Sequence, residues 1–120
     1  MTEREYIDYV RDMLDAIDKA SRFVVGMDYV TFAADDKTVF AVIRALEVIG
    51  EASRGLPDEV RAQHPGVPWR SIAGTRDRLI HRYFGVDLEV VWKTVQDDLP
   101  RLRPVLEQIV AEYPGAGNRS

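Results

Sequence analysis

Cysteine is absent from this chain of 120 residues, which excludes disulfide bonds, thiolate metal sites and cysteine nucleophiles. Long hydrophobic runs are absent as well, since none approaches the roughly 18 residues that a membrane-spanning helix needs. The first ten residues are charged and lack the apolar core of a signal peptide. We therefore expect a cytoplasmic protein that does not associate with membranes.

Basic residues are fewer than acidic residues. The net charge is −4, from 16 Lys and Arg against 20 Asp and Glu, which argues against a protein that coats nucleic acid by electrostatic attraction alone. Residues 70–82 are an exception, because they carry four arginines and one acidic residue, a local charge of +3. Such a patch suits brief contact with a few phosphates or with a nucleotide-bearing partner. Ordinary surface arginines on a helix are the competing interpretation.

Apolar residues recur at steps of three and four along most of the chain, a spacing that indicates an all-α protein. We predict an antiparallel four-helix up-and-down bundle with one extra short helix. Residues 1–113 would form its single domain, and residues 114–120 a disordered tail. The main helices are expected over residues 2–25, from Asp35 or Asp36 to residue 54, from Pro68 to about Tyr83, and after Asp87 with a kink at Pro100. The short helix covers residues 57–63, and residues 27–34 form a connection anchored by Tyr29 and Phe32.

The helix from residue 35 to residue 54 is apolar nearly all round, so we predict a homodimer in which it lies buried centrally or at the subunit interface. Its charged residues are Arg44, Glu47 and Glu51. One interpretation is an ion pair within the helix between Arg44 and Glu47. The other is that Glu47 or Glu51 pairs across helices with Arg76 and positions it.

The stretch from residue 75 to residue 87, TRDRLIHRYFGVD, contains the candidate catalytic residues of the chain. Arg76 falls inside an apolar helical stripe, where a guanidinium is costly unless it is paired or faces a shared cavity. His81 lies about 140° away from Arg76 around a straight helix. Either the helix ends near His81, where Gly85 is a plausible cap, or a second protomer completes the site. The other histidine, His64, precedes a proline and is expected to be extended and exposed.

These residues also resemble a known family. The pattern Arg76-x4-His81-x-Tyr83, followed by Phe-Gly-Val-Asp, is similar to the signature of HepT-like toxins of the HEPN superfamily. The blocks AVIRALEVIGEA, VPW and SIAGTRDRLIHRYFGVDLEVVW extend the resemblance from about residue 3 to residue 113. It implies a HEPN-like helical bundle and a metal-independent endoribonuclease toxin of a type VII-like toxin–antitoxin pair, without a cofactor.

The same resemblance implies roles for single residues. Arg76 and His81 would be the catalytic pair, and Tyr83 the residue to which an MNT-type nucleotidyltransferase antitoxin can attach AMP. Arg78 and Arg82 would steer the RNA backbone. Many family members carry Asn after the Arg, whereas this chain has Asp77, whose carboxylate either repels phosphate or orients Arg76 or His81.

Two alternatives remain open at this stage. The chain could be an inactive HEPN binding module that docks a nucleotidyltransferase, with Tyr83 only a contact or modification site. It could also be a structural helical dimer without a ligand, in which replacing Arg76 changes stability and nothing else. A ferritin-like iron site would need Glu-x-x-His pairs on facing helices, and the sequence contains none.

Overall fold

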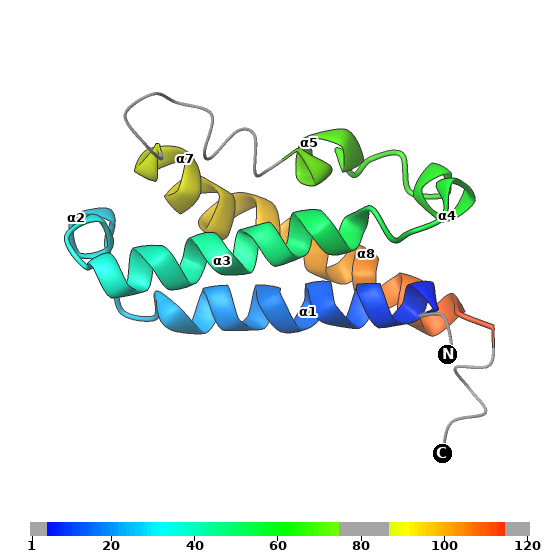
Figure 1. Cartoon of the computed structure of the whole chain (residues 1–120), viewed down its shortest axis with the longest axis horizontal. Helices are drawn as coiled ribbons and strands as arrows, with labels where there is room; N and C mark the ends of the chain where they lie inside the picture. Colours follow the sequence, from blue (N-terminus) through cyan, green and yellow to red (C-terminus); the bar gives the residue numbers. More distant parts are fainter. Residues whose placement is uncertain (1–4, 75–86, 115–120) are drawn as a thin grey trace, which may run out of the picture.

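Three long helical segments form the frame of the molecule. The computed structural model describes residues 5–74 and 87–114, and every regular element in that part is helical. Helices α1 (Tyr6–Phe23) and α3 (Asp36–Ser53) lie side by side and run in opposite directions, and α8 (Leu99–Glu112) packs against α1 (Figure 1). The predicted all-α bundle is confirmed.

The core lies between these helices. On α1 the buried residues follow the predicted spacing of three and four, as do those of α3 on the side that faces α1. Tyr6 closes one end of the core by packing its ring edge-on against Tyr113 at a centroid distance of 5.0 Å. Phe23, the last residue of α1, is 37% exposed, and the turn that follows it contains Gly26, which has a φ of +79°.

Helix α2 (Tyr29–Ala33) occupies the segment that was expected to be a non-helical connection, so that expectation is wrong. The side chain of Asp28 caps α2 by accepting a hydrogen bond of 2.8 Å from the backbone N–H of Thr31. This hydrogen bond lowers the pKa of the Asp28 carboxyl group. The anchoring role of Phe32 is confirmed, since its side chain is fully buried against Trp92.

Two further short helices follow: α4 (Asp58–Ala62) lies beyond the end of α3, and α5 (Trp69–Ala73) lies above α3 in Figure 1. The continuous helix predicted from Pro68 to Tyr83 is wrong, because α5 ends at Ala73 with Gly74 as its capping residue. Glycine has a low helix propensity, and the β-branched Thr75 follows it. Periodicity alone therefore did not reveal this end.

The C-terminal segment, a rod of consecutive helical elements, contains a π-helical turn in its middle. It begins as α7 (Leu88–Lys93), continues as a π-helical turn η1 (Thr94–Asp98) and ends as α8. Pro100, in the first turn of α8, has no N–H to donate, and its ring would clash with the carbonyl four residues earlier in a regular α-helix. The wider π turn relieves that clash, so the predicted interruption near Pro100 takes this form. Asp98 makes no capping hydrogen bond through its side chain.

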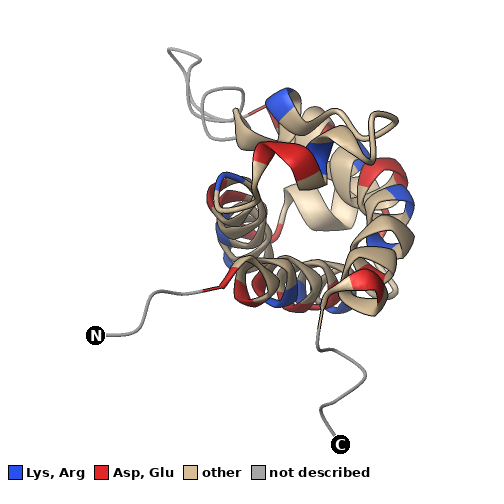
Figure 2. Cartoon of the chain, turned by 90° about the vertical axis from the view of Figure 1, so that its right-hand side faces the viewer, with Lys and Arg blue, Asp and Glu red and all other residues tan. Residues whose placement is uncertain are grey.

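Acidic and basic positions are interspersed around the outer faces of the helices (Figure 2). Arg103 connects α8 to α1, because its side chain donates hydrogen bonds of 3.0 Å to both carboxylate oxygens of Asp18. These bonds, with a second ion pair to Glu107, raise the pKa of the Arg103 guanidinium. No helix in the described ranges is long and apolar enough to cross a lipid bilayer.

Gly55 provides a test of the contact between the start of α1 and the end of α3. A Cβ atom added at Gly55 would lie 2.6 Å from Cγ of Tyr9, inside van der Waals contact. We predict that Gly55→Ala lowers the free energy of unfolding by about 1–3 kcal/mol, the range of overpacking substitutions, as measured by urea denaturation. Gly66→Ala is the matched control, since a Cβ there meets nothing within 4 Å. Equal stability of the two variants would contradict this packing.

Candidate functional site

The residues of the predicted catalytic motif lie outside the described part of the chain. These are Arg76, Asp77, Arg78, His81, Arg82 and Tyr83. The structure instead describes the elements on either side of them, Gly74 at the end of α5 and Asp87 at the start of α7. The described part of the site is therefore the frame that borders the motif segment.

Both boundaries of the motif segment are held by defined contacts. At the first boundary, the Arg54 side chain at the end of α3 donates a hydrogen bond of 2.9 Å to the backbone carbonyl of Ala73. At the second, the Asp87 carboxylate accepts hydrogen bonds from the N–H groups of Glu89 and Val90, which confirms the predicted cap of the following helix. Because α5 and α7 both pack against α3, one helix positions the two ends of the segment.

The loop before α5 is held by Trp69. Its indole N–H points at two backbone carbonyls, those of Arg61 at 3.1 Å and His64 at 3.0 Å. Trp69 is also partly buried against the hydrophobic core. His64 does not behave as expected: its side chain is only 11% exposed, with Nε2 3.9 Å from Oε1 of Glu112, so the predicted exposure is wrong. The loop folds back onto α8, which the proline rule for the backbone could not indicate.

The charged residues of α3 pair within the helix, but with a different partner from the one predicted. Arg44 lies 3.7 Å from Glu51, two turns further along, rather than bonding to Glu47. Both side chains are more than half exposed, so this ion pair contributes little to stability. The alternative role of Glu47 or Glu51 in positioning Arg76 involves a residue outside the described ranges and stays a prediction.

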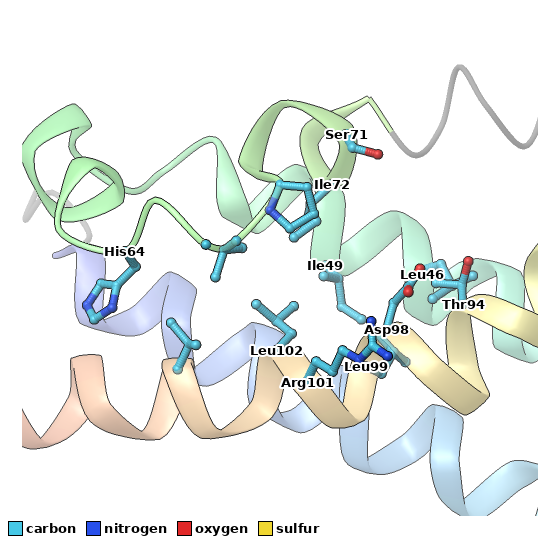
Figure 3. A pocket seen from close by; sticks show the side chains of 14 residues that line it. Leu46, Ile49, His64, Ser71, Ile72, Thr94, Asp98, Leu99, Arg101 and Leu102 are labelled. Carbon is cyan, nitrogen blue, oxygen red and sulfur yellow. The ribbon is translucent and has the colours of Figure 1, made fainter.

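An apolar cavity of about 610 Å³ lies between α3, the loop before α5 and the rod formed by η1 and α8 (Figure 3). Leu46 and Ile49 of α3, Ile72 of α5 and Leu102 of α8 supply much of its lining. Thr94 and Asp98, the two ends of the π turn, add polar groups to it. π-helical turns are frequent next to functional sites, and this cavity borders one.

A second and more open hollow, of about 660 Å³, lies on another side of α5. Three arginines line it: Arg54 from the end of α3, Arg61 from α4 and Arg70 from α5. Asp58, Trp69 and Gly74 also contribute to its lining. We call it the arginine hollow. Arg54 and Arg61 were not predicted from the sequence as site residues, because only the fold brings them near Arg70.

Metal ligands were not expected from the sequence. Within residues 5–74 and 87–114, no group of three or more His, Asp or Glu side chains is arranged so that it could hold a metal ion.

Comparison with known proteins identifies the family of this chain. The sequence profile of the HepT-like family, described as ribonuclease HepT-like, matches residues 13–109. The chain belongs to the HepT-like ribonuclease family. The match covers the described frame and also the motif segment, in agreement with the resemblance seen in the sequence.

Individual relatives agree with this assignment. A protein of Thermococcus cleftensis named probable ribonuclease HepT is 47% identical over 107 residues, which cover 89% of this chain and 97% of the relative. A candidate RNase of Methanocaldococcus jannaschii is 36% identical over 120 residues, covering 100% of this chain and 99% of the relative. A candidate RNase of Caldanaerobacter subterraneus is 38% identical over 109 residues, 91% of this chain and 95% of the relative. No solved structure matches the chain.

Proposed function

We propose that this chain is a metal-independent endoribonuclease that acts as the toxin of a HEPN/MNT toxin–antitoxin pair. The observation that carries the proposal is the motif Arg76-x4-His81-x-Tyr83 inside a chain of the HepT-like ribonuclease family. The names of its relatives, which refer to ribonucleases and match over nearly their whole length, support the reaction class.

The proposed reaction uses the RNA's own 2′-hydroxyl as the nucleophile. His81 takes the proton from this hydroxyl, and its oxygen attacks the adjacent phosphorus atom. The bond to the 5′-oxygen breaks, the proton returns to that oxygen, and the products are a 2′,3′-cyclic phosphate and a 5′-hydroxyl end. Arg76 binds the phosphate through two N–H groups and stabilises the negative charge that develops on its oxygens.

Neighbouring residues have supporting roles in this proposal. Arg78 and Arg82 contact flanking phosphates, and Tyr83 stacks on a base or bonds a phosphate. Glu47 or Glu51 of α3 orients Arg76. The support for this last role is the packing of both α5 and α7 on α3, since these helices border the motif segment.

The proposed partner is a nucleotidyltransferase antitoxin that attaches AMP to Tyr83. The modification would add a negative charge and a bulky group two residues from His81. RNA phosphates would then be repelled from the place where Arg76 binds them, so the toxin would be switched off without unfolding.

A homodimer is also part of the proposal. Phe40 on α3 is 74% exposed in the single chain, although α3 buries apolar residues along its opposite face. A large exposed aromatic side chain on such a helix favours a second copy as the covering surface. The dimer would also allow one protomer to supply Arg76 and the other His81, which is one of the two ways of bringing these residues to one phosphate that the sequence leaves open.

The alternative function is a non-catalytic module that docks a nucleotidyltransferase. The observation in its favour is Asp77, an acidic residue directly after Arg76 where many family members carry asparagine. A carboxylate at this position repels the substrate phosphate unless it is engaged with a neighbouring cation.

Cleavage of bulk tRNA and of single-stranded RNA in the presence of EDTA tests the catalytic proposal. We predict that the wild type cuts RNA and that His81→Ala and Arg76→Ala each lower the rate by about 10²–10⁴-fold, the usual contribution of an acid–base or phosphate-stabilising group. His64→Ala is the matched control, since it removes the other histidine, and it should retain nearly full activity.

If the wild type is folded, unmodified and inactive, the docking module becomes the better account. Asp77→Asn is then the informative variant, because recovered cleavage would identify Asp77 as the silencing residue. Equal rates for the wild type, His81→Ala and Arg76→Ala would eliminate the proposed site.

Tyr83 is tested with the purified nucleotidyltransferase and ATP labelled on its α-phosphate. We predict that the wild type takes up label and loses RNase activity in proportion, whereas Tyr83→Phe takes up none because it lacks the accepting hydroxyl. Tyr9→Phe, a change of the same kind on α1, should be labelled like the wild type. Label on Tyr83→Phe would place the modification elsewhere.

The dimer is tested by sedimentation equilibrium. The wild type should have twice the chain mass of 13.6 kDa at micromolar concentration. Phe40→Glu should shift it toward the monomer, because a charge in the interface core has no partner. Val25→Glu, at a residue 76% exposed outside α3, makes the same change of charge and should leave the dimer intact. A wild-type monomer would contradict the proposal.

A further inference from the structure

The arginine hollow brings together charges that lie apart in the sequence. Its three guanidinium groups come from the end of α3, from α4 and from α5, and its single carboxylate is that of Asp58. The surplus is two positive charges, whereas the whole chain has a net charge of −4. A local reversal of sign of this kind, in a concave surface, attracts anions.

The guanidinium groups differ in how they are held. Arg61 is bonded to the carboxylate of Asp58, which neutralises one positive charge. Arg54 donates to the carbonyl of Ala73, an uncharged group, so its charge is oriented but not neutralised. Among the residues that the structure describes, Arg70 has no ion pair. Two guanidinium groups are therefore available to a ligand, and one of them is already fixed in position.

Hydrogen bonds of Trp69 connect two walls of the hollow. Trp69 lines it, and the two carbonyls that accept from its indole N–H belong to Arg61 and His64. The backbone of α4 is thereby tied to the first turn of α5, the helix that carries Arg70. The Arg54 guanidinium, which is already held by Ala73, loses little conformational entropy when it binds a phosphate.

Gly74 joins the hollow to the motif, because it lines the hollow and Thr75 begins the motif segment. We propose that the arginine hollow binds the phosphodiester backbone of the RNA beside the bond that is cut, with Arg54 and Arg70 as the phosphate-binding residues. This inference rests on the proposed ribonuclease function and extends its substrate contact beyond the motif. The contact is independent of base sequence, since guanidinium groups on phosphates do not read bases.

Binding of a single-stranded RNA with 2′-O-methyl groups, which cannot be cut, tests the inference with the full chain. We expect Arg54→Gln/Arg70→Gln to weaken binding about tenfold at about 100 mM salt, as measured by fluorescence anisotropy. The slope of log K against log salt should decrease by about 1–1.5, since each phosphate contact on a single strand contributes about 0.7. Arg70→Gln alone should show about half of this change, and it leaves the hydrogen bond of Arg54 to Ala73 in place.

The matched control is Arg11→Gln/Arg22→Gln, which removes two exposed arginines of α1 and changes the net charge equally. It should bind RNA within about twofold of the wild type, because neither arginine lines the hollow and only net charge is altered. Equal weakening in the two double variants would overturn the inference, since net charge alone would then explain the effect.

The remaining outcomes separate this inference from the proposed function. Wild-type binding that is unchanged in the hollow variants overturns the inference and leaves the ribonuclease proposal standing. Failure of the wild type to bind RNA at all removes both. Weaker binding of the nucleotidyltransferase, with RNA binding unaffected, assigns the hollow to the protein partner and likewise overturns the inference.

Discussion

The burial of α3 is the constraint on which the rest of this structure depends. This helix packs against α1, α2, α5 and α7, and its buried residues include Val42, Leu46 and Ile49. Each such side chain contributes roughly 1.5–3 kcal/mol when it is removed from water. Elements too short to be stable alone, such as α5 and α7, are held because α3 offers them an apolar surface. The segment with Arg76 and His81 joins these two elements.

The contact between α3 and its neighbours also explains how a chain with a net charge of −4 can present a basic hollow. Arg54 at the end of α3 reaches Ala73, and this contact brings the last turn of α3 next to α5. Arginines of α4 and α5 then line one hollow together with Gly74, the last described residue before the motif segment. Attraction of RNA would be local, which suits an enzyme that binds its substrate briefly rather than a protein that coats it.

Long, strongly periodic features were predictable from the sequence. The apolar stripe of α1 and the caps at Asp35 and Asp87 all appear in the structure, because each reflects a local interaction. The first helix ends at Phe23, and the turn that follows it contains Gly26 with a positive φ, a conformation that favours glycine. The HepT-like motif was equally visible, since it is contiguous in the sequence.

Features set by tertiary contacts were not predictable. Helix α2 is only five residues long and exists because Phe32 packs against Trp92. His64 is nearly buried because its loop folds back onto α8. Arg44 pairs with Glu51 on an exposed face of α3, where local spacing does not decide the partner. The arginine hollow combines residues from three elements, so only the fold reveals it.

The central claim is that the chain cuts RNA by using the substrate's 2′-hydroxyl as the nucleophile. The most direct measurement uses two RNA oligonucleotides that are identical except for one 2′-deoxy sugar at the mapped cleavage position, with EDTA present. We predict that the unmodified RNA is cut to a 2′,3′-cyclic phosphate and a 5′-hydroxyl end, and that the 2′-deoxy substitution abolishes cutting at that bond. Continued cutting of the substituted RNA, with a 5′-phosphate on the product, would mean that water is the nucleophile and would contradict the claim.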